Sequence, residues 1–135
     1  MGKKILTGKR ILVIDDEENI RDLIKTRLEG SDFSVMTATD GVDGIAKLDD
    51  ERPDLIVLDL IMPGVNGFTF VKTIKYYKDF RSIPILLFSV REDDSKLFHD
   101  GEISCFMLKP FNFEELIAQV TQLLNNYPLA EATLN

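Results

Sequence analysis

Hydrophobic residues occur along the chain in short continuous runs, which alternate with stretches of helical periodicity. Four runs are apolar throughout and a fifth is weaker: Ile11–Ile14, Leu55–Leu58, Ile83–Phe88, Ile103–Leu108 and the weaker Phe33–Ala38. Strands without polar alternation are typical of a parallel sheet buried on both faces. Between the runs, apolar residues recur three and four positions apart, as in Ile20, Leu23 and Ile24, which predicts crossover helices. The pattern therefore predicts an α/β fold with a doubly wound, five-stranded parallel sheet.

The length and composition indicate a single folded domain. The chain has 135 residues, of which 44% are hydrophobic and 29% charged, as in an ordinary globular protein with a packed core. We expect this domain to span residues 10–126, after an N-terminal tail over residues 1–9. Residues 127–135 lose the hydrophobic periodicity after Pro128, so we interpret them as a C-terminal tail or the start of a linker.

The charge and the cysteine content restrict the partners and the compartment. A net charge of −7 disfavours direct binding of nucleic acid or of an anionic membrane surface. The single cysteine, Cys105, allows no internal disulfide, which favours a reducing compartment. The sequence also contains no targeting segment and no apolar stretch long enough to span a bilayer. We therefore expect a cytoplasmic protein.

Polar residues that could bind a ligand or take part in a reaction follow the predicted strands. Asp15 and Asp16 come after the first run, Asp59 after the third, Ser89 at the end of the fourth and Lys109 after the fifth. Singly, each has an ordinary explanation as a helix cap or a solvated side chain. Jointly they indicate a site, because ligands of open α/β sheets bind at the carboxyl ends of the strands. Clustered acids repel one another unless they are solvated or hold a cation.

Four motifs carry a family resemblance. "IDDEE", "LIVLDLIMPGVNGF", "ILLFS" and "MLKPF" occur in this order, and over residues 10–126 the chain resembles the receiver domain of two-component response regulators. The resemblance is to single-domain receivers of the chemotaxis-regulator type. It implies a flavodoxin-like sheet in the strand order 2-1-3-4-5 with five helices. Met62, Pro63, Gly64 and Gly67 of the second motif are expected to shape the loop after Asp59, with Gly67 at the start of the third helix.

The resemblance implies that Asp59 accepts a phosphoryl group from a histidine kinase or a phosphotransfer protein. A carboxylate that attacks a phosphoryl group needs nearby positive charge and in-line positioning. The implied cation is Mg²⁺ or Mn²⁺, bound by Asp15, Asp16, Asp59 and the backbone carbonyl of Ile61, since such ions prefer oxygen ligands. Lys109 is implied to pair with Asp59 or with the phosphoryl oxygens.

Further residues are implied in catalysis and in switching. Ser89 would donate its hydroxyl to the phosphoryl group and move toward it, while Phe106 turns inward. Phe106 has no hydroxyl, so burial alone would drive its movement, and a permanently buried ring fits the sequence equally well. The peptide bond before Pro110 is expected to be cis and to aim Lys109 inward.

The sequence departs from the family pattern near Ser89. Val90 stands where the family usually has a small residue, and Arg91 follows it. We hypothesise that both residues slow phosphorylation and dephosphorylation, Val90 by narrowing access and Arg91 by holding phosphate oxygens. The stretch between Ser89 and Lys109 is also short, which weakens the prediction of a helix near Glu92–Lys96.

Other functions remain open at this point. A flavodoxin-like redox protein is disfavoured because "DDEEN" would repel a flavin phosphate. A haloacid-dehalogenase-type phosphatase needs a second acid two residues after its nucleophile, where this chain has Ile61. The main alternative is a pseudo-receiver, a docking module that is not phosphorylated. We expect no enzymatic activity beyond the domain's own phosphorylation and dephosphorylation, and a downstream protein target or effector domain. The sequence is compatible with a stand-alone regulator or with a receiver from a longer protein.

Overall fold

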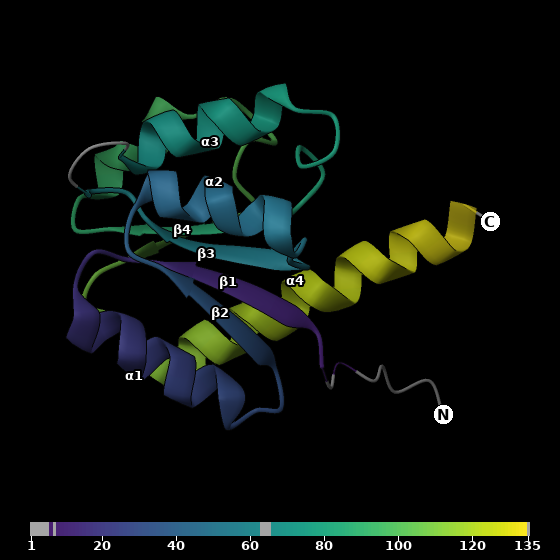
Figure 1. Cartoon of the computed structure of the whole chain (residues 1–135), viewed down its shortest axis with the longest axis horizontal. Coiled ribbons are helices and arrows are strands. Elements are labelled where there is room, and N and C mark those ends of the chain that lie inside the picture. Colours follow the sequence, from purple (N-terminus) through teal and green to yellow (C-terminus); the bar gives the residue numbers. More distant parts are fainter. Residues whose placement is uncertain (1–5, 7, 63–65, 135) are drawn as a thin grey trace.

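The computed structural model describes residues 6, 8–62 and 66–134. Within this part of the chain, five parallel strands form one sheet in the order β2-β1-β3-β4-β5, shown in Figure 1. The strands are β1 (Arg10–Ile14), β2 (Ser34–Ala38), β3 (Leu55–Asp59), β4 (Ile85–Ser89) and β5 (Cys105–Leu108). The flavodoxin-like order 2-1-3-4-5 is therefore confirmed.

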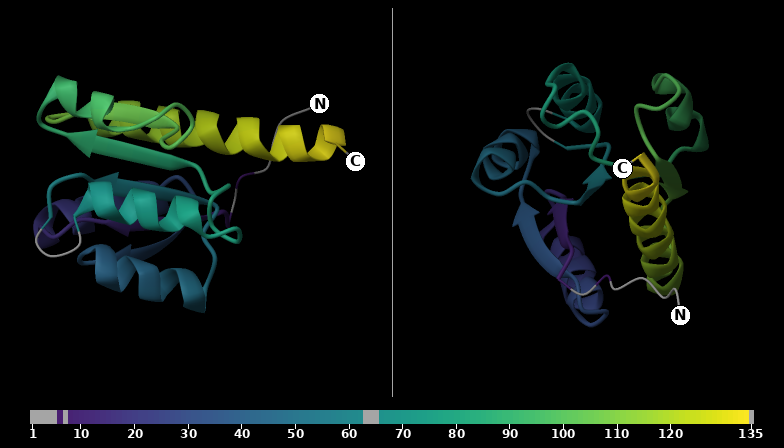
Figure 2. Two further views of the ribbon diagram at one scale, coloured as in Figure 1. Left: turned by 90° about the horizontal axis from the view of Figure 1, so that it is seen from above. Right: turned by 90° about the vertical axis from the view of Figure 1, so that its right-hand side faces the viewer.

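Helical segments connect the strands and cover both faces of the sheet. The described residues form α1 (Glu18–Glu29), α2 (Gly41–Asp50), α3 (Gly67–Tyr76), the 3-10 helix η1 (Glu92–Leu97) and α4 (Phe113–Leu134). Helices α2 and α3 lie on one face, and α1 and α4 lie on the other (Figure 1). Figure 2 shows the same arrangement of helices on both faces of the sheet from two further directions. The expected five helices are therefore present, the fourth as a 3-10 helix.

Alternate side chains of each strand enter two separate apolar clusters. Ile11 and Val13 pack against α1 and α4, whereas Leu12 and Ile14 pack against α2 and α3. All four side chains are fully buried. Burial of each aliphatic side chain stabilises the fold by about 1.5–3 kcal/mol, so a slip of one residue in strand register would be costly. The double burial explains why the strands lack polar alternation.

The fourth helical segment is shorter than an α-helix of this fold would be. It is a 3-10 helix of six residues, Glu92–Leu97, and is followed by a turn in which the amide of Glu102 donates to the carbonyl of His99 at 3.1 Å. Because 3-10 helices are rarely longer than a few residues, this segment suits a short connection. The connection between β4 and β5 therefore reaches the next strand without a full α-helix.

Helix α4 extends farther than the sequence pattern predicts. Residues 127–135 were expected to be irregular, yet the helix continues through Pro128 to Leu134. A proline removes one helical hydrogen bond, but the leucine, alanine and glutamate residues after it have high helix propensity. The last turns of α4 project past the edge of the sheet in Figure 1. Within the described part of the chain, no helix has the length and apolar composition needed to cross a bilayer.

Candidate functional site

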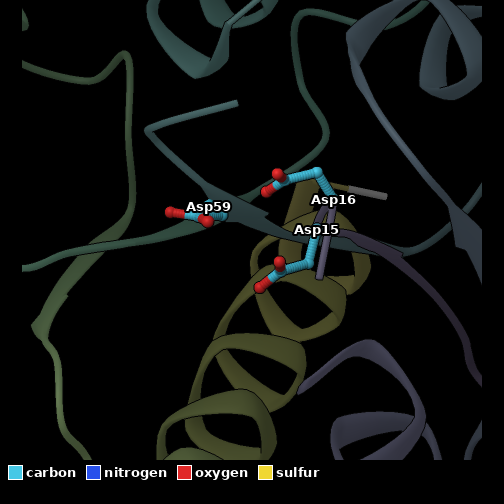
Figure 3. A group of neighbouring side chains, drawn as sticks. All are labelled: Asp15, Asp16 and Asp59. Carbon is cyan, nitrogen blue, oxygen red and sulfur yellow. The ribbon is translucent and has the colours of Figure 1, made fainter. Parts of the chain in front are cut away.

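Three aspartates meet at the carboxyl ends of β1 and β3. Asp15 and Asp16 directly follow β1, and Asp59 is the last residue of β3. Because Ile14 is in register with Leu58 in the neighbouring strand, the residues that follow lie next to one another. One oxygen atom from each carboxyl group lies within 4.8 Å of the others. Figure 3 shows the three side chains gathered at this edge with their carboxyl groups turned to the same side.

Asp15 is the most deeply buried member of this aspartate trio. Its exposed fraction is 0%, and its Oδ1 accepts a hydrogen bond from the amide of Glu17 at 2.8 Å. Its Oδ2 is buried and has no hydrogen-bond partner among the described residues. Burial, reinforced by the negative charges of Asp59 and Asp16, raises the pKa of Asp15 from 3.8 to about 6 despite the opposing effects of the Glu17 amide and Lys109. A buried oxygen without a donor fits a site for a cation.

Asp59 lies between a positive charge and a backbone amide. The Nζ of Lys109 is 3.3 Å from its Oδ2, and the amide of Ile61 donates to its Oδ1 at 3.3 Å. Burial raises the pKa of Asp59, while Lys109 and the Ile61 amide limit that rise. The ammonium group of Lys109 also lies 4.9 Å from the ring centre of Phe88, and the Lys109–Pro110 peptide bond is cis. The structure thus brings Lys109 and the backbone of Ile61 to the expected acid.

The backbone after Asp59 is fixed by close packing of α3. The amide of Gly67 donates to the carbonyl of Leu60 at 2.8 Å. A β-carbon at Gly67 would lie 2.6 Å from the Cα of Leu60 and 2.7 Å from the carbonyl oxygen of Asp59. Only glycine allows this approach without a backbone shift. Pro63 and Gly64, also expected to shape this loop, lie outside the described residues.

Ser89 ends β4 at the same edge of the sheet, but its hydroxyl bonds to another residue. Ser89 is buried and its Oγ donates to Oδ2 of Asp94 at 2.6 Å. Phe106 is partly buried against the apolar cluster under α2 and α3. Val90 is exposed beside the site, and the Nε of Arg91 lies 3.4 Å from Oδ1 of Asp94. Arg91 is thus paired within its own segment.

Two residues near the site were not predicted from the sequence. Arg21 of α1 donates from Nη1 to the backbone carbonyl of Asp15 at 2.9 Å and so holds the loop after β1. Asp94 of η1 is buried against Ser89. Arg21 carries a weak signal, since it lies in the first turns of the helix that follows the acidic cluster. Asp94 carries no such signal, because the adjacent Glu92 and Asp93 are also acidic and yet are exposed.

The fold and the site define a doubly wound α/β domain with three clustered aspartates next to a lysine, as in receiver domains. Residues 11–121 match the family model of the response regulator receiver domain. The chain therefore belongs to this family, and it is a receiver domain of a two-component response regulator.

Relatives with this domain include transcriptional regulators. The chain is 36% identical over 125 residues to the alkaline phosphatase synthesis transcriptional regulatory protein PhoP of Bacillus subtilis, covering 91% of this chain and 51% of that protein. It is 37% identical over 117 residues to the DNA-binding dual master transcriptional regulator RpaA of Synechocystis, covering 85% of this chain and 48% of that protein. The chain thus spans about half the length of these relatives.

Solved structures with the same fold include a chemotaxis regulator. The chemotaxis response regulator CheY4 of Vibrio cholerae superimposes with a TM-score of 0.80 at 29% identity, covering 86% of this chain and 98% of that chain. NtrX of Brucella abortus superimposes with a TM-score of 0.84 at 26% identity, covering 94% of this chain and 29% of that chain. The fold therefore occurs in proteins of very different total length.

Proposed function

We propose that Asp59 accepts a phosphoryl group from a histidine kinase or a phosphotransfer protein in a Mg²⁺-dependent reaction. The observation that carries this proposal is a buried carboxylate with a lysine ammonium group 3.3 Å away, within a trio of aspartates. The phosphorylated domain then presents a changed surface to a downstream protein target or an effector domain. On this proposal the protein acts in the cytoplasm and catalyses only its own phosphorylation and dephosphorylation.

The chemistry requires Asp59 to act as a nucleophile. One carboxylate oxygen attacks the phosphorus of a phosphohistidine, the new P–O bond forms, and the P–N bond breaks with its electron pair going to the imidazole. The product is an acyl phosphate on Asp59. Lys109 faces the same carboxylate, and its ammonium group would stabilise the negative charge that develops on the phosphoryl oxygens. The amide of Ile61 holds the other oxygen of Asp59 and thereby orients the carboxyl group.

Mg²⁺, or Mn²⁺ in its place, would be held by the carboxylates of Asp15, Asp16 and Asp59 and by the backbone carbonyl of Ile61. When bound, the cation offsets the carboxylate charges and binds phosphoryl oxygens. The buried Oδ2 of Asp15, which has no donor among the described residues, supports this assignment. Arg21 holds the backbone of Asp15 and so keeps the acid in place.

The surroundings of the site support a protein as the phosphodonor. A depression beside Lys109 is lined by apolar side chains that include Leu23, Val90 and Phe113. Leu23 and Val90 are large and exposed and line the depression beside Lys109, so a partner that covers them gains apolar contact as it delivers its phosphoryl group. A free small phosphate ester would not use this surface.

Incubation with acetyl phosphate and Mg²⁺, followed by intact mass measurement, tests the proposal. We expect a gain of one phosphoryl group, which is absent in Asp59→Asn and absent when a chelator removes the metal. Asp22→Asn, which changes an exposed acid of α1, serves as the matched control and should retain the gain. No gain in the unaltered protein would contradict phosphorylation and support the pseudo-receiver alternative.

A further inference from the structure

The hydroxyl of Ser89 is bound by a buried acid in the structure. Its Oγ donates to Oδ2 of Asp94 over 2.6 Å, and the two residues are 1% and 6% exposed. A carboxylate can only accept, so the serine supplies the proton. Short hydrogen bonds to a carboxylate are about twice as strong as neutral ones. The serine is therefore firmly oriented toward η1.

The backbone of η1 determines which acid reaches Ser89. The amide of Asp94 donates to the carbonyl of Arg91 at 3.1 Å, which sets the turn that points this side chain inward. The neighbouring Asp93 points to solvent and pairs with Lys96 at 3.4 Å. The second oxygen of Asp94 faces the Nε of Arg91 at 3.4 Å. The acid thus accepts a hydrogen bond at one oxygen and forms an ion pair at the other.

We propose that Asp94 is a positioning residue that holds Ser89 in the unphosphorylated arrangement and opposes the phosphorylated one. The inference rests on the proposed function, in which Ser89 donates its hydroxyl to the phosphoryl group. A serine hydroxyl has one proton, so it cannot donate to Asp94 and to a phosphoryl oxygen at the same time. Asp94 and the phosphoryl group therefore compete for a single donor.

The burial of Asp94 makes this competition costly. When Ser89 turns away, Oδ2 of Asp94 loses its donor inside the protein, and a buried acceptor without a partner is unfavourable. A modification shifts a two-state equilibrium only by its difference in interaction with the two states. The phosphoryl group must therefore first offset the Ser89–Asp94 hydrogen bond. Removal of the acid should tighten binding of any group that mimics phosphoryl on Asp59.

Calorimetric titration with beryllium fluoride in saturating Mg²⁺ measures this effect at equilibrium. Beryllium fluoride binds a carboxylate as a mimic of a phosphoryl group. We expect Asp94→Ala to bind it about tenfold more tightly than the unaltered protein, the size of one hydrogen bond to a charged group. Asp94→Asn keeps the shape with a weaker acceptor and should lie between the two. Asp93→Ala, at the exposed neighbouring acid, should not change the affinity.

A second variant separates positioning from a general structural effect. In a Ser89→Ala background, Asp94→Ala should leave the affinity unchanged, because the competing donor is gone. An equal tightening in that background, or no tightening in the single variant, would overturn the inference. Where Asp94→Ala does not fold, Asp94→Asn carries the same comparison. Absence of binding by the unaltered protein would instead defeat the proposed function itself, and the inference with it.

Discussion

The buried aspartate at the end of β1 should weaken the metal-free fold near neutral pH. Asp15 is fully buried, and the nearby acids Asp16 and Asp59 repel its charge. Asp15→Asn removes the charge and keeps the acceptor that binds the amide of Glu17. The new amide group can donate to the neighbouring carboxylates. We therefore expect Asp15→Asn to stabilise the protein when no cation is present.

The size of the effect follows from the pKa of Asp15. The pKa of Asp15 is about 6 in the folded protein, against 3.8 for an ordinary aspartate, and this difference corresponds to about 3 kcal/mol at neutral pH. The folded state binds the proton more tightly than the unfolded state. The penalty is therefore fully present above about pH 6 and is relieved as the pH falls from there toward 3.8. The stability of the unaltered protein should therefore increase as the pH falls from about 6 toward 3.8.

Urea unfolding with a chelator present measures the difference between the two proteins. With a slope of about 2 kcal/mol per molar urea, the midpoint of Asp15→Asn should lie about 1.5 M higher near neutral pH. The difference should shrink as the pH falls below about 6 and become small near pH 4. Asp22→Asn, at an exposed acid of α1, controls for the loss of one charge.

The outcome that refutes the reasoning is a variant no more stable than the unaltered protein near neutral pH. A gain that does not change with pH would also refute it, because the charge of Asp15 would then not be its cause. Added Mg²⁺ gives an independent readout. It should stabilise the unaltered protein and stabilise Asp15→Asn much less, since the cation has then lost a ligand.

Two other substitutions test the packing around the site. Gly67→Ala places a β-carbon 2.6 Å from the Cα of Leu60, in the loop after β3, so we expect a loss of about 1–3 kcal/mol in urea unfolding and slower phosphorylation. The control is Gly30→Ala, where the β-carbon would lie 3.4 Å from the nearest backbone oxygen atoms. A loss in Gly67→Ala no larger than that in Gly30→Ala would contradict the expectation. Lys72 pairs with Glu102 at 2.7 Å in a partly buried setting, so Lys72→Met should cost about 1–2 kcal/mol. Lys25→Met, in an exposed pair, is the control, and an equal loss there would refute the claim.

The fold was predictable because the burial pattern is simple. The three inner strands β1, β3 and β4 are buried on both faces, and the two clusters around Leu12 and Val13 show the reason. Once the strands are parallel, the acids that follow β1 and β3 must meet at one edge. The aspartate trio therefore follows from strand boundaries alone. No knowledge of side-chain geometry is needed for the trio. Lys109 follows β5, which is separated from β3 by β4, so its contact with Asp59 was implied by the family resemblance.

The connection between β4 and β5 was not predictable in the same way. Asp94 is the one buried residue of its short 3-10 helix, and a single buried position leaves no period to detect. The continuation of α4 past Pro128 also differs from the prediction, because a proline usually ends or kinks a helix whereas here the helix continues through it. In both places local backbone geometry, and not the hydrophobic pattern, determines the structure.

The two buried acids of the site differ in a way that separates their roles. Asp94 accepts a hydrogen bond from Ser89 at one carboxylate oxygen and forms an ion pair with Arg91 at the other, so the protein itself supplies a partner for each oxygen. Asp15 keeps one buried oxygen without a donor among the described residues and carries a raised pKa. A buried acceptor that the chain leaves unsatisfied costs stability, which is tolerable where a ligand supplies the missing partner. Asp15 is therefore suited to bind a cation, whereas Asp94 is suited to hold Ser89, the residue that on our proposal donates its hydroxyl to the phosphoryl group.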